Sequence, residues 1–396
     1  MPAAYDHPKL IFVFTYNFIA NRAGSYNRTR QMLSILRDNG IRVTVYSKDS
    51  MGDRFWDNSA KRWKKQDREE FEREYPGFEL VLDTVTFGSW IARKLKNLAC
   101  ALLPMRAANI LRIGIPFLDP NWESLKTRSA EILVVGYTNT LPELNGVFGR
   151  FCVVDQHDIE FVLNQRTRDS FFFEIPVLLK ARREVAMLET LRMIISISYS
   201  ESIVNRMLLQ NPTVVYLPNL SEFDSRRYAL AAPNYDLLFV GGDSHFNRSG
   251  LSTFLREAVN RRATYKIAIV GLVCNSVEII EIAGRSEHIE LLGFVKDLDA
   301  LYATSRATVC PIEGAGTKTK LLESLQHQRP VFASRRSLEG LIPGYEKCVF
   351  PLDLERIEDV LQANPEVHLE CVRYIEKYES AIRDNEFIEL VKRVAV

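Results

Sequence analysis

The sequence feature that most constrains the fold is the stretch 307–334, in which apolar runs alternate with a glycine turn and a helical pattern. An apolar run at 307–311 is typical of a buried strand, and the turn Glu-Gly-Ala-Gly-Thr follows at 313–317. Helical spacing then resumes at Leu321, Leu322 and Leu325, and a second apolar run begins at Val331. A strand, a helix and another strand in this order are typical of a parallel βαβ unit. The stretch therefore predicts an α/β fold.

The turn at 313–317 is predicted to bind an anion. It would present the free backbone N–H groups at the start of the helix, together with the positive end of the helix dipole. Thr317 supplies a hydroxyl, and Lys318 and Lys320 supply cationic groups within one turn, which suits a phosphate or diphosphate. Glu323 lies on nearly the same helix face as Lys320 and is placed to accept hydrogen bonds from a sugar hydroxyl. The alternative is a turn without a ligand, because this pattern is common in α/β proteins.

The same stretch resembles a known signature. The run G-x-G-T-K-x-K-L-L-E-x-L-x-x-x-x-P-V begins at Gly314 and is followed by E-G-L at 339–341, which is similar to the C-terminal signature of GT-B glycosyltransferases of the family 4 type, also called glycosyltransferase group 1. The resemblance implies that Lys320 meets the diphosphate of the donor and that Glu323 meets its ribose. It also places three residues of the turn in the donor site: Gly316, Thr317 and Lys318.

Two positions depart from the family pattern. The family has an upstream glutamate that faces the donor sugar at a shorter spacing than the nine residues between Glu313 and Glu323 here. Glu313 is therefore the candidate counterpart, with a changed spacing. Gln328 and Arg329 also stand where small residues, often glycine, usually precede the Pro-Val pair.

Length and composition limit the remaining possibilities. A chain of 396 residues predicts two domains, since single cores rarely grow beyond about 250–300 residues. The formal charge of +1 gives no global attraction to nucleic acid. No apolar run approaches the roughly 20 residues that span a bilayer, and the N-terminus lacks the pattern of a signal peptide, so a cytoplasmic protein is expected. The six cysteines include no C-x-x-C pair, which argues against a zinc site or a redox motif and favours small buried side chains.

The N-terminal segment predicts a second βαβ unit. Residues 9–16 and 42–47 read as strands, and residues 26–39 between them read as a helix. No G-x-G-x-x-G follows the first strand, so there is no dinucleotide fingerprint. In the resembled family a glycine loop at this point closes over the cleft, which would here be Gly24 with Arg28 nearby. A plain loop is the alternative.

A polar segment follows the predicted strand 151–155 and reads Asp155-Gln-His157-Asp158. Polar residues at the carboxyl end of a parallel strand lie where α/β folds place their ligands. The segment resembles the D-x-H-D of many family 4-like enzymes, which implies that His157 and Asp158 face the cleft near the reacting groups. A histidine that only makes a hydrogen bond at the strand end is the alternative.

A second strand followed by glycines opens the C-terminal half. The apolar run 236–240 leads into Gly241-Gly242, with Arg248 and a predicted helix at 250–259 after it. This segment resembles the F-V-G segment of the same family, in which a glycine loop and nearby basic side chains approach the donor phosphates. Gly242 and Arg248 are therefore candidate donor-binding residues. A solvated arginine at a helix start is the alternative for Arg248.

Residues 90–112 combine apolar side chains with lysines and arginines and contain no acidic residue. A basic apolar helix of this kind can lie on an anionic membrane surface, which would suit a lipid-linked acceptor and peripheral contact at the inner membrane face. Packing in the core or in the acceptor cleft is the alternative.

Taken together, the sequence predicts a GT-B glycosyltransferase with two Rossmann-like domains that face each other across a cleft. Residues 1–220 would form the acceptor-side domain, 221–234 the linker, 235–366 the nucleotide-sugar domain and 367–396 a helix that crosses back to the first domain. The substrates would be a nucleotide-sugar and a glycan, lipid-linked or small-molecule acceptor. No D-x-D stands at a strand end, because the D-L-D at 297–299 falls in a predicted helix. Transfer is therefore expected to need no metal and no cofactor, with the retention of configuration that the family implies.

Two other functions remain compatible with the sequence. A GT-B sugar-nucleotide epimerase would bind the same donor and form product without an acceptor. A noncatalytic nucleotide-sugar or glycan-binding protein would keep the fold, and the changed spacing of Glu313 leaves this open. Donor turnover separates the binding protein from the enzymes, and the effect of an added acceptor separates the two enzymes.

Overall fold

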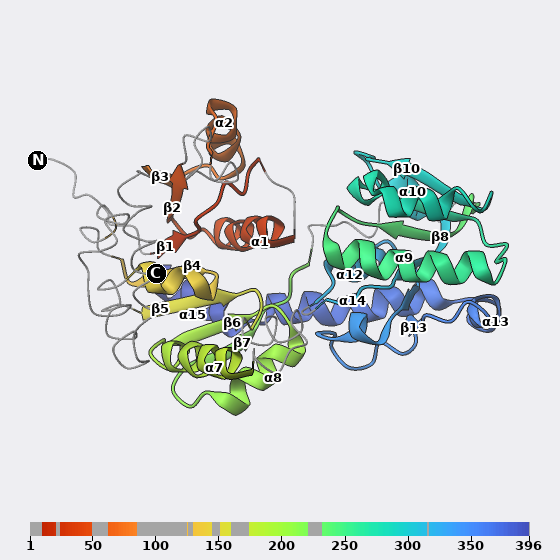
Figure 1. Cartoon of the computed structure of the whole chain (residues 1–396). Helices are drawn as coiled ribbons and strands as arrows, with labels where there is room; N and C mark the ends of the chain where they lie inside the picture. Colours follow the sequence, from red (N-terminus) through yellow and green to blue (C-terminus); the bar gives the residue numbers. More distant parts are fainter. Residues whose placement is uncertain are drawn as a thin grey trace, which may run out of the picture. The chain divides into compact units, whose positions relative to one another are not determined.

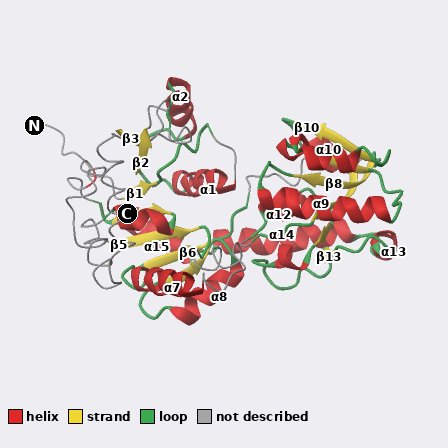
Figure 2. Cartoon of the chain, viewed as in Figure 1, coloured by secondary structure: helices red, strands yellow, loops and turns green. Residues whose placement is uncertain are grey.

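The chain folds as two units, each built on an open parallel sheet with helices on its faces (Figures 1 and 2). The computed structural model describes residues 10–20, 24–49, 62–84, 125, 130–144, 151–159, 174–220, 232–314 and 317–395. The first unit comprises Met1–Ile197, Glu201–Asn219 and Arg383–Val396, and the second comprises Ser198–Ser200 and Leu220–Ile382. The predicted α/β fold class is confirmed.

The first unit contains a seven-stranded sheet in the order β3-β2-β1-β4-β5-β6-β7, with every pair parallel. Its strands are β1 (Leu10–Val13), β2 (Val43–Asp49), β3 (Glu79–Thr84), β4 (Ile132–Gly136), β5 (Phe151–Gln156), β6 (Met193–Ser196) and β7 (Thr213–Tyr216). Its helices are α1 (Gly24–Asp38), α2 (Lys65–Glu74), η4 (Thr138–Glu143), α7 (Glu174–Leu188), α8 (Tyr199–Leu208), whose first two residues group with the second unit, and α15 (Glu386–Ala395).

Continuous apolar runs form the middle of this sheet. Every residue of β1 and β4 is buried, because helices cover both faces of the sheet and leave no face for polar side chains. Ile11 of β1, Leu133 of β4 and Val154 of β5 belong to one core cluster. The edge strand β3 is only partly buried and was not predicted, since its apolar run, Leu80 to Leu82, is only three residues long and lies between Glu79 and Asp83.

The second unit contains a six-stranded parallel sheet in the order β10-β9-β8-β11-β12-β13. Its strands are β8 (Tyr235–Val240), β9 (Ile267–Val270), β10 (Ile289–Gly293), β11 (Ser305–Cys310), β12 (Val331–Ala333) and β13 (Val349–Pro351). Its helices are α9 (His245–Asn260), η7 (Leu272–Asn275), α10 (Val277–Ala283), α11 (Asp299–Ala303), α12 (Thr319–Gln326), η8 (Arg335–Leu338), α13 (Ile357–Ala363) and α14 (Val367–Arg383).

Two helices differ from the sequence prediction. Helix α9 begins at His245 rather than at 250, because Ser244 accepts a hydrogen bond from the N–H of Asn247 and so caps the helix earlier. The single helix expected at 367–396 is two helices, α14 and α15. They part because the side chain of Asn385 accepts a hydrogen bond from the N–H of Phe387 and starts α15 anew. Helix α15 then packs against α1 within the first unit.

Among the described residues, no helix is both long and apolar enough to span a membrane. The basic segment 90–112 and the linker residues 221–231 lie outside the described residues. Five cysteines are described, and all of them are buried and unpaired: Cys152, Cys274, Cys310, Cys348 and Cys371.

Candidate functional site

The loop that leaves β11 is anchored by two serines. Ser337 Oγ lies 2.7 Å from the carbonyl oxygen of Cys310 and accepts a hydrogen bond from the N–H of Ile312 at 3.1 Å. Ser334 Oγ donates to the carbonyl oxygen of Ile312 at 2.8 Å. Both serines belong to the segment that opens η8, so the end of β11 is fixed before the glycine turn begins.

Helix α9 approaches this loop at a glycine. A Cβ atom on Gly250 would overlap the carbonyl oxygen of Pro311 and lie 2.8 Å from its carbonyl carbon. Only a residue without a side chain allows the helix and the loop to meet this closely. The two predicted phosphate-facing segments, one after β8 and one after β11, are therefore packed directly against each other.

Lys320 joins these two segments. It stands in the first turn of α12, and its Nζ donates a hydrogen bond to Asn247 Oδ1 of α9 at 2.8 Å. The same Nζ lies 4.5 Å from the ring centroid of Phe239, at the end of β8. Burial lowers the pKa of Lys320 to about 8. The nearby Cys310 and Glu323 act against that fall. The direct contacts of the ammonium group are an amide oxygen and an aromatic ring, so it can still receive an anionic ligand.

Lys320 also depends on the glycine after β8. A Cβ on Gly241 would lie 3.2 Å from Lys320 Nζ and would overlap the ring of Phe239. Gly242, the predicted donor-binding glycine, has nothing within 4 Å of where its Cβ would be, and its carbonyl accepts a hydrogen bond from Asn247 Nδ2 at 2.8 Å. Asn247 thus links Gly242 to Lys320. It was not predicted, although it stands directly before the chosen Arg248, because only the tertiary structure shows which of the two side chains reaches Lys320.

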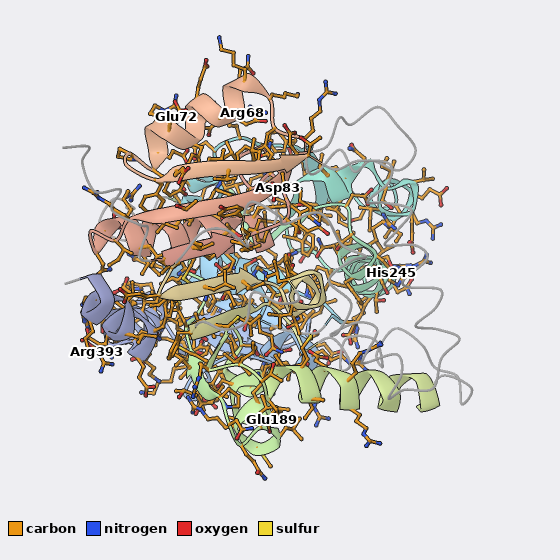
Figure 3. All side chains as sticks on the ribbon, turned by 90° about the vertical axis from the view of Figure 1, so that its left-hand side faces the viewer. Arg68, Glu72, Asp83, Glu189, His245 and Arg393 are labelled. Atoms are coloured by element: carbon orange, nitrogen blue, oxygen red, sulfur yellow. The ribbon has the colours of Figure 1, made fainter. Side chains whose placement is uncertain are left out.

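Arg248 lies near this site but is engaged elsewhere. Its Nη1 is 2.6 Å from Asp243 Oδ1, and both side chains are partly exposed. Such a pair is weakly held in water, so Arg248 can exchange Asp243 for another anion at small cost. The exposed residue His245 opens the same helix and is labelled in Figure 3.

Glu323 stands one turn after Lys320 and is partly buried. Burial raises its pKa, and the nearby His327 and Lys320 act against that rise. His327 is held on three sides: its Nδ1 lies 2.8 Å from the carbonyl oxygen of Glu323, its Nε2 lies 3.0 Å from Asp299 Oδ1, and its ring stacks on Tyr302 at 4.1 Å. Asp299, the last residue of the D-L-D, is the first residue of α11, and its pairing with His327 ties α11 to the end of α12.

A small cavity lies beneath Lys320. It is lined by Tyr302, Thr308, Cys310 and Ser324, together with apolar residues of β8 and β11. The hydroxyl groups of Tyr302 and Thr308 are buried without a hydrogen-bond partner.

The other candidate residues of the glycine turn make contacts away from Asn247 and Phe239. Thr317 Oγ1 donates to the carbonyl oxygen of Gly340 at 3.3 Å, and Gly340 has a φ of 89° that favours glycine. Lys318 is buried and precedes the first residue of α12, where its carbonyl accepts the N–H of Leu321. Gly316 lies outside the described residues.

Glu313 is exposed and forms an ion pair with Arg336, with 3.4 Å between Oε2 and Nε. Both side chains are about half exposed. The carboxylate is therefore held by a contact that a ligand can displace.

In the first unit, His157 belongs to a buried charged cluster. Asp155 Oδ1 accepts a hydrogen bond from Arg28 Nη2 at 2.8 Å, and both side chains are almost fully buried. His157 Nε2 lies 3.4 Å from Asp155 Oδ2, and the ring of Tyr137 covers the imidazole at 4.1 Å. Burial acts to raise the pKa of Asp155, but the Arg28 cation and His157 outweigh it and hold the pKa at about 2.

The structure places both residues that were expected at the closing loop. Arg28 ties α1 to the end of β5 and also donates a hydrogen bond to the carbonyl oxygen of Pro218 at 3.0 Å. It is therefore a buried residue that holds three segments of the first unit together. Gly24, expected in a loop, is the first residue of α1. Asp158 is partly buried beside His157. The pairing of Arg28 with Asp155 was not predicted, because the two residues lie 127 positions apart in the chain.

Residues 234–363 match the family described as Glycosyl transferases group 1. No curated protein sequence shows significant similarity to the chain. Within the described residues, no group of three or more histidine, cysteine or acidic side chains is arranged to hold a metal ion.

Solved structures share the fold over almost the whole chain. A sucrose-phosphate synthase from Thermosynechococcus elongatus has a TM-score of 0.61 at 13% identity, with 95% of this chain and 96% of that chain covered. TarM from S. aureus, in complex with fondaparinux, alpha-GlcNAc-glycerol and UDP, has a TM-score of 0.62 at 9% identity, with 98% of each chain covered. HepE from Anabaena, in complex with UDP and glucose, has a TM-score of 0.54 at 12% identity, also with 98% of each chain covered. These likenesses establish the GT-B fold.

Proposed function

We propose that this chain, a glycosyltransferase whose second unit is a group 1 domain, moves a sugar from a nucleoside diphosphate donor to an acceptor hydroxyl. The observation that carries the proposal is the position of Lys320. Its ammonium group stands where the segment after β8 meets the segment after β11, and it is held there by Asn247 and Phe239. A cation at the start of a helix, beside two glycine turns, suits a diphosphate.

The site has to stabilise the negative charge that develops on the leaving diphosphate. The acceptor oxygen bonds to the anomeric carbon while the bond from that carbon to the diphosphate breaks, and the hydroxyl proton passes to the departing diphosphate. Lys320, Thr317, Lys318 and the first N–H groups of α12 would stabilise the charge that develops there. Arg248 would add a second cation after releasing Asp243. We propose a metal-independent transfer with retention, as the family resemblance implies.

UDP is the first nucleotide to test, because TarM and HepE have been solved in complex with UDP. Glu323 would accept hydrogen bonds from the ribose. The backbone of Glu323 is held by His327, whose Nδ1 lies 2.8 Å from the Glu323 carbonyl oxygen. Glu313 would face the donor sugar after leaving Arg336.

The first unit would supply the acceptor side. His157 and Asp158 follow β5, where Arg28 and Asp155 fix the backbone, and we propose that they lie next to the acceptor hydroxyl. The acceptor is a glycan, a lipid-linked sugar or a small glycoside, and a cytoplasmic location with peripheral membrane contact through 90–112 remains part of the proposal.

The test is thermal melting with a panel of nucleoside diphosphates and their sugars, with and without magnesium. A ligand at about 100 times its Kd adds about 2.7 kcal/mol to the stability of the folded state. We expect UDP or another diphosphate to stabilise the wild type without metal and to fail on Lys320→Ala.

Lys266→Ala is the matched control. Lys266 Nζ also lies over an aromatic ring, 5.0 Å from the centroid of Tyr235, but it precedes β9 and so stands at the opposite edge of the same sheet. Equal loss of stabilisation in both variants, or no stabilisation of the wild type by any diphosphate, would contradict the donor site. Turnover of the donor only with an added acceptor supports a transferase, whereas product without an acceptor supports an epimerase.

A further inference from the structure

Aromatic side chains follow three neighbouring strands of the first sheet, at the point where each strand ends. Phe14 and Tyr16 come after β1, Tyr137 comes directly after β4, and His157 comes directly after β5. These strands are parallel neighbours in the order β1-β4-β5, so their carboxyl ends meet at one edge of the sheet. Tyr26 joins them from the first turn of α1. Ligands of open α/β sheets bind at this edge.

Three of these residues form what we call the aromatic platform: Tyr16, Tyr26 and Tyr137. The ring centroids of Tyr16 and Tyr26 are 6.3 Å apart, and those of Tyr16 and Tyr137 are 6.5 Å apart, both with nearly perpendicular planes. Phe14 lies under the platform: its ring stacks on Tyr137 at 5.6 Å and meets the edge of Tyr26 at 6.2 Å.

The platform is a surface with a buried base. Phe14 is fully buried, whereas Tyr16, Tyr26 and Tyr137 are each partly exposed. The base depends on Gly136, because a Cβ at that position would lie 2.7 Å from the Phe14 ring. Burial, and after it the nearby Tyr16, raises the pKa of the Tyr26 phenol, as expected for two phenol groups close together.

The backbone of Tyr137 indicates that this surface serves a ligand. Tyr137 has a φ of 70°, a conformation that favours glycine and costs free energy for a bulky side chain. A tyrosine kept there despite the strain indicates that its ring has a use. His157, beneath Tyr137, is 95% buried, and its Nε2 faces Asp155 Oδ2 at 3.4 Å, so this ring is fixed below the platform.

Tyrosine rings suit one class of ligand in particular. Each ring offers an apolar face and a phenol hydroxyl at its end, at a low cost in side-chain entropy. A pyranose ring has the complementary surface, with a face of C–H groups and a rim of hydroxyls. A lipid tail would leave the phenol groups unused, and an acyclic polyol has no flat face to stack.

We propose that the aromatic platform binds a pyranose ring of the acceptor, so that the acceptor is a glycan or glycoside. This inference rests on the proposed transferase function, and it identifies the substrate class on the first unit.

The experiment is saturation-transfer NMR on the full chain without donor. The probes are the methyl glycosides of glucose, galactose and N-acetylglucosamine, with sorbitol as the acyclic control. On irradiation of the aromatic protons, we expect transfer to the ring C–H groups of at least one glycoside and none to sorbitol. Tyr16→Leu and Tyr26→Leu should each weaken that binding about tenfold, whereas Tyr26→Phe, which keeps the ring, should stay within about threefold.

Phe78→Leu is the matched control. Phe78 is also partly exposed and stacks on another ring, that of Tyr75 at 5.8 Å, but it precedes β3 and so stands at the amino edge of the sheet. We expect it to bind the glycoside like the wild type.

Absence of transfer to every glycoside in the wild type would overturn the proposal, and so would equal binding by the wild type and both leucine variants. Stabilisation by UDP is measured on the same proteins. If it persists while glycoside binding is absent, the acceptor inference fails and the donor site stands; if it is absent as well, the proposed function itself fails.

Discussion

Replacing Lys320 with methionine should stabilise the folded protein while abolishing donor binding. The pKa of Lys320 is lowered by burial from 10.5 to about 8. A difference of about 2.5 pKa units corresponds to about 3.4 kcal/mol, which the folded state loses at pH 7 by keeping this ammonium group charged. Methionine fills a similar volume without the charge. It also loses the hydrogen bond to Asn247, worth about 1 kcal/mol, so the expected net gain is about 2 kcal/mol.

The pH dependence identifies the cause of this gain. Below pH 8 Lys320 is charged in both the folded and the unfolded state, and the full cost is present. Between pH 8 and 10.5 the unfolded state binds more protons than the folded state, so the wild type gains stability as the pH rises. The advantage of Lys320→Met should therefore shrink from pH 7 to pH 9.5. Above pH 10.5 the variant should be the less stable protein by about 1 kcal/mol, because only the lost hydrogen bond then remains.

The assay is urea unfolding of both proteins without ligand at pH 7 and pH 9.5, followed by the same measurement with UDP. We expect the methionine variant to be more stable alone and to gain nothing from UDP. If it is less stable at pH 7, or if its advantage is the same at both pH values, burial of a charged lysine is not what lowers the pKa.

Three further predictions follow from the contacts. Donor affinity, measured by calorimetry, should fall about tenfold per pH unit above pH 8, because the diphosphate needs the charged form of Lys320; an unchanged affinity up to pH 10 would contradict this. Arg28→Met should lower the free energy of unfolding by about 3–5 kcal/mol, since it leaves the Asp155 carboxylate buried without its guanidinium partner. Arg68→Met, which removes the more exposed ion pair to Asp49, should cost less than about 1 kcal/mol in the same urea titration. Gly250→Ala should destabilise the second unit by about 1–3 kcal/mol and weaken UDP binding, because the new Cβ would overlap Pro311. Gly284→Ala is the control and should do neither, because its Cβ would meet nothing closer than 3.4 Å. Similar melting curves for the two variants would refute the argument that α9 needs a glycine at this contact.

Local patterns were enough to predict most of the fold. The continuous apolar runs at β1, β4 and β8 identify parallel strands because both faces of such a sheet are covered. The glycine turn before α12 carries its own signal, since a turn, two lysines and a helical pattern lie within a few residues of each other. The edge strand β3 carried a weaker signal, because a partly buried edge requires only a short apolar run.

The partners of the candidate residues could not be predicted in this way. Lys320 was chosen from its own segment, but Asn247, which holds its Nζ, lies 73 positions away. Arg28 was placed beside a closing loop, and the fold instead buries it against Asp155. Tyr16, Tyr26 and Tyr137 gave no motif, because the segments that carry them are not adjacent along the chain.

The sequence by itself determined which segments become strands and helices and which one carries the group 1 signature, since these follow from hydrophobic periodicity, glycine turns and the order of residues within one βαβ unit. Only the tertiary structure decided which side chains meet. Parallel strands bring their carboxyl ends to one edge whatever their distance in the chain, and burial at that edge then sets the charge of Lys320 and the pairing of Asp155. Those properties depend on the surroundings of a side chain, which a linear sequence does not contain.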